Sequence, residues 1–419
     1  MTVELRPFGT RCNIQCHYCY QDPRRITGQL ARKFDMDKMK EAILDEGGPF
    51  SLFGGEPLMV PIPDLKELWS WGHAQFGQNT IQTNGTLIRQ EHVELFRSYN
   101  VSVGISVDGP AELNELRWAG RDDVTRAMTA RTERAIELLC REGIRTSLII
   151  TLHRSNAVGE RLGRLVDWVR SLERLGVIAI RLHLLESEFD EIRRRYALTT
   201  QENVTALQAF LALETQLGTL AIDVFQDMRR MLVGNDRNAT CVWKSCDPYT
   251  TRAVRGVEGD GQRSNCGRTN KEGIEFVKSD LEGFERTLAL YATPQAAGGC
   301  KGCRFFLMCR GHCPGTAIDG DWRNRSEHCE VWKAMFVQLE RELAARGHTP
   351  LSLHRHRTVV ERRMLEGWCK GRNLPLADEV AKLRTAANRS NWRRELDVIR
   401  QDVTAALRTS HGREANETS

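Results

Sequence analysis

Three cysteines near the N-terminus and eight in the second half of the chain are the residues best suited to chemistry. Cys12, Cys16 and Cys19 follow one another in the spacing CX3CX2C. Iron–sulfur clusters bound by protein alone take four thiolates each. Three early ligands therefore leave one iron of a [4Fe–4S] cluster open, whereas eight later ligands suffice for two closed clusters. This combination indicates an enzyme that generates radicals. The later group is Cys241, Cys246, Cys266, Cys300, Cys303, Cys309, Cys313 and Cys329.

Disulfide bonds and structural zinc are the alternative uses of these cysteines. A disulfide framework needs an oxidising compartment, and the N-terminus lacks the basic and apolar segments of a signal peptide. Zinc fits the short spacings between Cys300 and Cys313, because tetrahedral zinc sites also use short spacings. Zinc leaves the early three cysteines without a nearby fourth ligand, so it remains an alternative for the later group only.

The charge of the chain is concentrated at its C-terminal end. From residue 347 onward there are 14 Lys and Arg against 9 Asp and Glu, which equals the whole net charge of +5. No basic patch interleaved with aromatics precedes this tail, so we expect no nucleic-acid partner. No apolar run reaches membrane-spanning length. We therefore expect a cytoplasmic protein with reduced thiols and no membrane partner.

Residues 3–185 alternate apolar, strand-like runs with amphipathic helical segments. Six strand–helix units in succession predict an α/β fold with a parallel sheet, most simply a partial (β/α)6 barrel of the TIM type. The strand-like runs cover residues 3–7, 50–53, 80–83, 101–107, 146–152 and 177–185.

Polar and glycine-rich motifs follow these predicted strands. The sequence GGEP at 54–57 follows the second strand, NG at 84–85 follows the third, and DGP at 108–110 follows the fourth. Barrel enzymes build their sites at the C-terminal ends of the strands. We therefore expect these motifs and the early cysteines to meet at one mouth of the barrel.

The alternation stops after Leu185, where we expect a small domain folded around metal clusters in place of an apolar core. A helix over 199–219 leads into it, and a helix over 327–343 closes it. We place the domain boundaries at 1–225 for the barrel, 226–346 for the cluster-binding domain and 347–419 for a basic, partly helical C-terminal extension.

Taken together, these motifs resemble the radical SAM superfamily, and within it the members with a C-terminal SPASM domain. The early match comprises CX3CX2C with Tyr18 before its last cysteine, GGEP at 54–57, QTNG at 82–85 and SVDGP at 106–110. The late match comprises Gly261 five residues before Cys266, then a CX2CX5CX3C run from Cys300 to Cys313, then Cys329. The resemblance extends over residues 3–343.

The resemblance implies that the open iron binds the amino and carboxylate groups of S-adenosylmethionine, whose reductive cleavage gives a 5′-deoxyadenosyl radical. Gly54 and Gly55 would let the backbone approach the amino group, and Glu56 would accept from it. Ser106 would contact the ribose or carboxylate, and Tyr18 would lie by the adenine. The full set of implied contacts is Tyr18, Gly54, Gly55, Glu56, Asn84, Ser106, Asp108 and Arg117.

The resemblance also implies three [4Fe–4S] clusters, of which the early cysteines hold the open one. The first auxiliary cluster would be held by Cys241, Cys246, Cys266 and Cys313. The second would be held by Cys300, Cys303, Cys309 and Cys329. Because Cys313 crosses to the first cluster, the two groups must fold together.

Closed clusters beside the barrel mouth are suited to accept an electron from a substrate radical, which favours net-oxidative chemistry. Members of the resembling family mostly modify peptides, so we expect a ribosomally made precursor peptide, a cross-linked or desaturated product, and a low-potential flavodoxin or ferredoxin as electron donor. Cys12 comes too early for a leader-binding domain ahead of the barrel. The barrel, a separate protein or the basic tail would then hold any leader.

Three alternative functions remain open. In anaerobic sulfatase-maturating enzymes an aspartate usually follows the cysteine that is Cys266 here, but this chain has Gly267. Their His-Asp after the DGP motif is replaced by Asn and Glu at 114–115, and Arg117, a candidate carboxylate clamp, lies one place early. Peptide epimerisation would need Cys140 or Cys369 as a hydrogen donor. A non-catalytic iron–sulfur redox protein would not need the open-iron cysteines with GGEP.

Overall fold

The computed structural model describes residues 3–26, 33–187, 189–250, 254–269, 279 and 281–384. Its first half is built on a sheet whose first six strands follow chain order and pair in parallel. This arrangement confirms the predicted α/β fold. The strands are β1 Val3–Arg6, β2 Phe50–Leu52, β3 Asn79–Thr83, β4 Val101–Ser106, β5 Thr146–Leu152 and β6 Ala179–Leu184.

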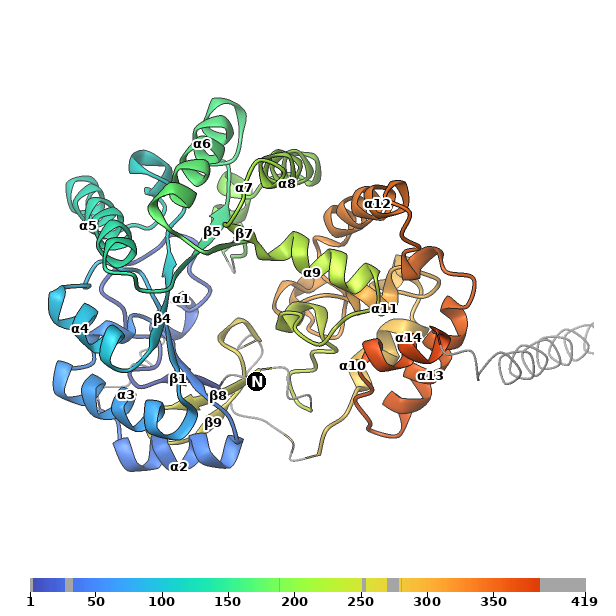
Figure 1. Ribbon diagram of the computed structural model, residues 1–419, viewed down its shortest axis with the longest axis horizontal. Helices are drawn as coiled ribbons and strands as arrows, with labels where there is room; N and C mark the ends of the chain where they lie inside the picture. The colour runs from blue at the N-terminus through green and yellow to red at the C-terminus, as the bar shows by residue number, and fades with distance from the viewer. Residues whose placement is uncertain are drawn as a thin grey trace, which may run out of the picture.

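Helices cover the outer face of this sheet (Figure 1). The Asp35 side chain caps the N-terminus of α2 by accepting from Lys38 N at 3.1 Å. Gly47 and Gly176, both in the left-handed conformation, end α2 and α6. The helices are α1 Asp22–Ile26, α2 Met36–Glu46, α3 Ile62–Phe76, α4 Gln90–Ser98, α5 Asp122–Arg141, α6 Gly159–Leu175, α7 Asp190–Tyr196 and α8 Thr200–Glu214.

The two faces of the sheet differ in polarity. Along each strand, every second residue is apolar and buried, for example Leu148 and Ile150 on β5. On the inner face, each of four neighbouring strands carries a small polar residue, namely Ser51, Thr80, Ser102 and Ser147, although larger side chains such as Gln82 and Ile149 face the same cavity. Barrel interiors are usually filled by bulky branched side chains. Here the small residues leave an interior cavity of about 560 Å³.

Three short strands extend the sheet beyond the six that the sequence predicts. β7 (Ala221–Ile222) pairs with β6, so the strand–helix alternation does not stop after Leu185 as expected. β8 (Arg255–Glu258) pairs in parallel with β1, and β9 (Arg263–Ser264) pairs antiparallel with β8. β7 and β9 have two residues each, too few for a periodic pattern, and β8 is defined by its pairing with the distant β1. Since β7 and β9 are the two ends of the sheet, the barrel is open.

Arg6 joins β1 to the segment that leads to Cys266. Its side chain is completely buried. The guanidinium donates from Nε to Glu258 Oε1 at 2.8 Å and from Nη2 to Ser264 Oγ at 2.5 Å and Asn265 O at 2.6 Å. Charge-assisted hydrogen bonds of this kind are strong and directional. Arg6 therefore fixes where the Cys266 segment meets the barrel.

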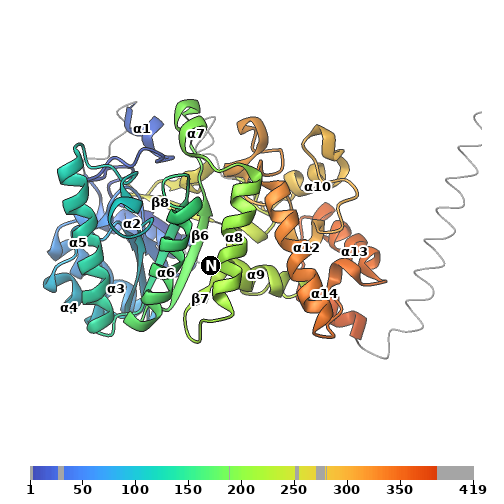
Figure 2. The same cartoon turned by 90° about the horizontal axis from the view of Figure 1, so that it is seen from above.

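The second half of the chain lies at the open side of the barrel (Figures 1 and 2). Helix α12 packs against α8 and α9, and its Trp332, Phe336 and Leu339 are buried. Across the described ranges, no helix combines the length and apolarity needed to cross a membrane. The helices of this half are α9 Asp223–Leu232, α10 Glu285–Ala292, α11 Phe306–Cys309, α12 Cys329–Ala345, α13 Arg357–Cys369 and α14 Leu376–Arg384.

The described part of the C-terminal extension braces this half. Asp236 Oδ2 accepts from Arg310 Nη2 at 2.9 Å and from Leu376 N at 3.0 Å, and its Oδ1 accepts from Ala377 N at 3.2 Å. One carboxylate thus ties the start of α14 to the loop between Cys309 and Cys313. The predicted partly helical character holds for α13 and α14, and residues 385–419 lie outside the described residues.

We expect Arg6→Met to destabilise the protein, because it leaves Glu258 buried without its cation. Removing one partner of a buried ion pair costs roughly 3–5 kcal/mol in the free energy of unfolding. Urea denaturation measures this cost. The matched control is Arg97→Met, whose exposed ion pair with Glu142 contributes about 0–1 kcal/mol. Equal effects in the two variants would contradict the role given to Arg6.

Candidate functional site

The loop that carries the three early cysteines lies unusually close to the end of β2. Gly55 N donates to Gly9 O at 2.9 Å, and Glu56 N donates to Arg11 O at 2.8 Å. A Cβ on Gly55 would lie 1.9 Å from Arg11 O, and one on Gly54, whose φ is 120°, would lie 2.5 Å from Gly9 O. Only glycine fits at either position. The cysteine loop therefore needs both glycines, whereas their predicted approach to S-adenosylmethionine stays a prediction.

A cavity of about 190 Å³ opens beside this loop, at the C-terminal ends of the strands. Most of the residues that the sequence predicted as a site line it, although they come from five separate segments. Glu56 and Asp108 do not line it and lie behind its wall. The predicted residues in the lining are Cys12, Cys16, Tyr18, Cys19, Gly54, Gly55, Asn84, Ser106 and Arg117.

The three thiols of this loop are suited to a metal cluster. Burial raises the pKa of Cys12 to about 11, and it also raises the pKa values of Cys16 and Cys19. Thiols with such pKa values stay protonated at neutral pH unless a metal replaces the proton. Three thiols facing one cavity therefore fit an iron–sulfur cluster with one iron left for a further ligand.

Glu56 connects the ends of β2 and β3. Its carboxylate is 1% exposed and accepts from Leu58 N at 3.0 Å, Thr83 Oγ1 at 2.7 Å and Asn84 N at 2.8 Å. Burial raises the pKa of Glu56 despite these hydrogen bonds. In the structure both oxygens face protein donors, so the contact with an amino group that the sequence predicted stays a prediction.

Asn84 continues this connection to the cysteine loop. Its side-chain Nδ2 donates to Asn13 Oδ1 at 2.8 Å and lies 3.8 Å from Cys12 Sγ. Its Oδ1 accepts from Thr86 N at 2.9 Å. Asn84 therefore holds Cys12 and its neighbour against β3 while lining the cavity.

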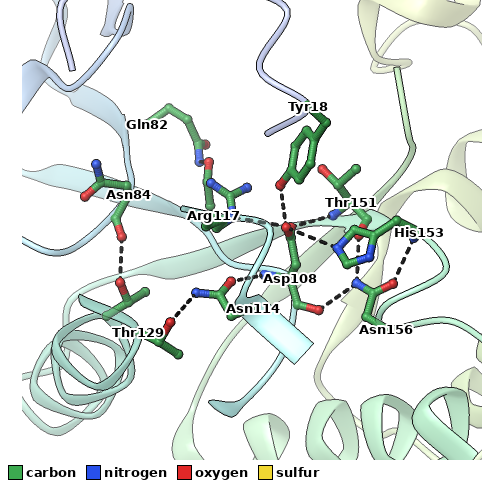
Figure 3. Close-up of polar contacts among 12 residues, drawn as sticks. Tyr18, Gln82, Asn84, Asp108, Asn114, Arg117, Thr129, Thr151, His153 and Asn156 are labelled. Atoms are coloured by element: carbon green, nitrogen blue, oxygen red, sulfur yellow. Dashed lines mark hydrogen bonds and ion pairs between the residues drawn. The ribbon is translucent and has the colours of Figure 1, made fainter. Parts of the chain in front are cut away.

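Asp108 is the centre of a buried hydrogen-bond network (Figure 3). Its Oδ2 accepts from the Tyr18 hydroxyl, and its Oδ1 accepts from Thr151 N at 3.1 Å. Arg117 Nε lies 3.3 Å from Oδ1, and His153 Nε2 lies 3.5 Å from Oδ2. The carboxylate thus holds two residues of the cavity wall, Tyr18 and Arg117, in place.

Electrostatics keep this carboxylate charged. Burial opposes ionisation of Asp108, but the charge of Arg117 and the hydrogen bonds from His153 and Tyr18 outweigh it and lower its pKa. The sequence predicted Asp108 as a cofactor contact. In the structure Asp108 lies behind the residues that line the cavity, and the contact stays a prediction. Asn114, at a position where the resembling enzymes differ, accepts from Asp108 N at 2.8 Å and donates to Thr129 Oγ1 at 2.9 Å.

Ser106 and Arg117 complete the cavity wall. The segment of Arg117 hydrogen-bonds to the cysteine loop, with Gln15 N donating to Trp118 O at 2.6 Å and His17 N to Leu116 O at 2.9 Å. Ser106 Oγ accepts from Gln82 Nε2 at 2.8 Å, which fixes the hydroxyl at the end of β4. The Arg117 guanidinium lies 5.9 Å from the centre of the Tyr18 ring, and Asp108 keeps its pKa raised despite burial. A fixed cation on this wall can bind a carboxylate.

The cavity shares a wall with the hollow interior of the barrel. His183 on β6 faces both spaces, as do Gln82, Glu186 and Arg268. Burial lowers the pKa of His183 well below its ordinary value, and the nearby Arg268 adds to this, so the imidazole is neutral. Sequence reasoning missed His183, although its alternation with Leu182 and Leu184 on a predicted strand was a usable signal.

The later cysteines form two groups in space. Four of them surround a small enclosed cavity of about 20 Å³, which Phe305, Phe306, Trp332 and Phe336 also line. Within the described ranges no three or more His, Cys, Asp or Glu side chains are arranged to hold a single metal ion. The four cysteines around the small cavity are Cys300, Cys303, Cys309 and Cys329.

The other group is Cys241, Cys266 and Cys313, with Cys246 nearby. Burial raises the pKa of Cys241 to about 12, and the neighbouring Cys313 adds to this. The pKa of Cys266 lies well above its ordinary value, because of burial and then of Glu4, Cys313 and Cys241. Four cysteines of one implied set therefore line one cavity, and in the other set Cys313 raises the pKa values of Cys241 and Cys266, while the two four-cysteine cluster sites stay predictions.

Comparisons with known proteins agree with this geometry. Residues 7–169 match the radical SAM superfamily. The chain is 31% identical over 173 residues to a serine-type anaerobic sulfatase-maturating enzyme of Bacteroides thetaiotaomicron, covering 37% of this chain and 40% of that enzyme. It is 23% identical over 374 residues to a cysteine-type anaerobic sulfatase-maturating enzyme of Clostridium perfringens, covering 80% and 95%.

The fold also resembles a solved structure described as native anSMEcpe with bound AdoMet and Cp18Cys peptide. The TM-score is 0.61 at 18% identity, and the match covers 82% of this chain and 98% of that one. At this identity the likeness to the solved structure concerns the fold, and the superfamily match extends over residues 7–169.

We expect Gly55→Ala to disrupt the cysteine loop, because the added Cβ would overlap Arg11 O. Iron per chain should fall from about twelve toward about eight, the loss of one four-iron cluster. Gly163→Ala is the control, since Gly163 lies in α6 and a Cβ added there would meet no atom within 4 Å, and alanine favours helix by about 1 kcal/mol. Full iron content in Gly55→Ala would contradict the packing argument.

Proposed function

We propose that this protein is a radical SAM enzyme with a SPASM domain that oxidatively modifies a peptide. The two later cysteine groups would each hold a closed [4Fe–4S] cluster, and the early cysteines an open one. The proposed domains are the barrel at 1–225, the SPASM domain at 226–346 and the extension at 347–419. The observation that carries the proposal is the pair of adjoining cavities, one lined by the early cysteines and the other by Cys241.

S-adenosylmethionine would bind in the cavity of about 190 Å³. Bound there and reduced by a flavodoxin- or ferredoxin-type donor, the cofactor supplies a 5′-deoxyadenosyl radical. Arg117 would bind the methionine carboxylate, since its charge is fixed by Asp108. Ser106 would donate to the ribose, and Tyr18, held by Asp108, would pack beside the adenine.

The peptide residue to be modified would enter the interior cavity, where the two spaces meet at His183 and Gln82. The substrate would lose a hydrogen atom at this junction to the 5′-deoxyadenosyl radical, which so becomes 5′-deoxyadenosine. A second hydrogen would then leave the substrate as a proton and an electron. A cluster in the SPASM domain would accept the electron. The neutral imidazole of His183 can take the proton. The product is then lighter than the substrate by two hydrogens.

Sulfatase maturation is the second candidate, because the relatives reported above bear that name. At the position after Cys266, a Cβ on Gly267 would lie 3.0 Å from Tyr20 Cε2 and 3.3 Å from Arg6 Nη1. Tyr20 therefore occupies the space that an aspartate side chain would need. This packing favours a reaction other than sulfatase maturation.

Epimerisation is less well supported by where the remaining cysteines lie. Cys140 belongs to α5, outside the sheet, and its sulfur lies beside Thr146. Cys369 is exposed at the end of α13. Neither lines the two adjoining cavities, so neither is placed to return a hydrogen atom to a substrate there.

Replacing Cys12, Cys16 and Cys19 together by alanine should abolish 5′-deoxyadenosine formation while leaving about eight irons per chain. The measurement is iron analysis and chromatography of anaerobically reconstituted, dithionite-reduced protein. Cys140→Ala serves as the control and should keep both 5′-deoxyadenosine formation and the iron content of the parent protein. A triple variant that still cleaves S-adenosylmethionine would show the assignment to be wrong, and a parent protein that never cleaves it would support a non-catalytic redox role.

The reaction class is tested on a small peptide encoded beside this protein, incubated with the reduced enzyme and S-adenosylmethionine. We expect a mass loss of about two hydrogens, as a cross-link or desaturation gives. An unchanged mass with solvent deuterium at one α-carbon would indicate epimerisation. Conversion of a sulfatase Cys or Ser peptide to formylglycine would instead identify a sulfatase maturase.

A further inference from the structure

Arg286, on helix α10, is a buried cation that ties together the loops of both later cysteine groups. Its side chain is 1% exposed. Its Nη1 donates to Cys246 O at 3.1 Å and to His312 O at 3.2 Å, and its Nε donates to Trp322 O at 2.6 Å. Its Nη2 donates to Asn324 O at 2.8 Å. The guanidinium therefore directs its donors to backbone carbonyls.

The guanidinium of Arg286 forms no ion pair with a carboxylate in the part of the chain that the structure describes. Asp247 accepts from its backbone N–H at 3.1 Å, not from its guanidinium. Two other fully buried arginines differ in this respect: Arg6 pairs with Glu258 at 2.8 Å and Arg310 pairs with Asp236 at 2.9 Å. A buried charge without a counter-charge is costly. Carbonyl dipoles lower that cost but leave the net charge in place.

The cysteine thiols are the groups placed to supply the missing negative charge. Burial lowers the pKa of Arg286, while negative charge on Cys246, Cys313 and Cys300, and then on Asp247, would raise it. Cys246 and Cys313 belong to the first group, and Cys300 belongs to the second. Arg286 contacts the Cys246 and His312 carbonyls beside the first group, and Leu290 on the same helix accepts from Cys300 N of the second group at 2.7 Å.

We propose that Arg286 is a shared counter-charge that raises the reduction potentials of both auxiliary clusters. The inference rests on the proposed function, because it takes the later cysteines to hold two clusters. One-electron reduction adds one negative charge to a cluster, and a fixed cation in a low-dielectric interior stabilises the form with the added charge. Net charge and hydrogen bonding around a cluster are known determinants of its potential. Arg286 therefore acts as a positioning residue that keeps both clusters able to accept an electron.

The test is a redox titration of the full-length, anaerobically reconstituted protein, followed by electron paramagnetic resonance. Arg286→Met should lower the midpoint potentials of both auxiliary signals and leave the S-adenosylmethionine-sensitive signal unchanged. Arg286→Lys keeps the charge and should stay near the parent values. The control is Arg229→Met, which removes a guanidinium that pairs with Glu214 at 2.6 Å and should shift none of the signals.

Unchanged midpoints in Arg286→Met with full iron content would overturn the proposal, and a shift of only one auxiliary signal would show that the charge is not shared. If Arg286→Met does not assemble, Arg286→Lys decides: parental midpoints support the role of the charge, whereas shifted midpoints assign the effect to hydrogen-bond geometry. Failure of the proposed function is seen separately, as parent protein that binds zinc or only one cluster.

Discussion

The contact between the cysteine loop and the end of β2 is the constraint on which the rest of the site depends. Gly54 and Gly55 lie so close to the backbone of Gly9 and Arg11 that no side chain fits between them. The loop can then hydrogen-bond to the strand end like an additional strand, and its three thiols face the cavity. Glu56 and Asn84 extend the same connection to β3. The catalytic mouth is therefore held by backbone contacts before any cofactor binds.

Buried charged side chains position the other segments that form the site. Arg6 fixes the Cys266 segment to β1, Asp108 holds Tyr18 and Arg117 on the cavity wall, and Arg286 joins the loops of the later cysteines. Arg6 and Asp108 satisfy their charge with several partners, as buried ions must. Arg286 differs because its partners are carbonyls, and the same physical requirement then points to the thiolates beside it.

The sequence predicted the six strands, the C-terminal position of the motifs and the lining of the first cavity, because periodicity and glycine placement are local signals. It could not predict β7, which has only two residues, or β8, which exists through its pairing with the distant β1. It also predicted cofactor contacts for Glu56 and Asp108, which lie behind the residues that line the cavity, and those contacts stay predictions. The position of these two carboxylates depends on hydrogen-bond donors from other strands, such as Thr83 for Glu56 and Thr151 for Asp108. Only the folded chain brings these donors close to the carboxylates. The interior cavity was missed for the same reason, since Ser51, Thr80, Ser102 and Ser147 empty the barrel only through their alignment across four strands.

The central claim is that the chain holds one open and two closed clusters. Adding S-adenosylmethionine to the fully reduced protein and recording its electron paramagnetic resonance spectrum tests this most directly, because only an iron with a free site can bind the cofactor. We expect one of three cluster signals to change and the other two to stay the same. A spectrum in which no signal changes, or in which all of them change, would contradict this claim.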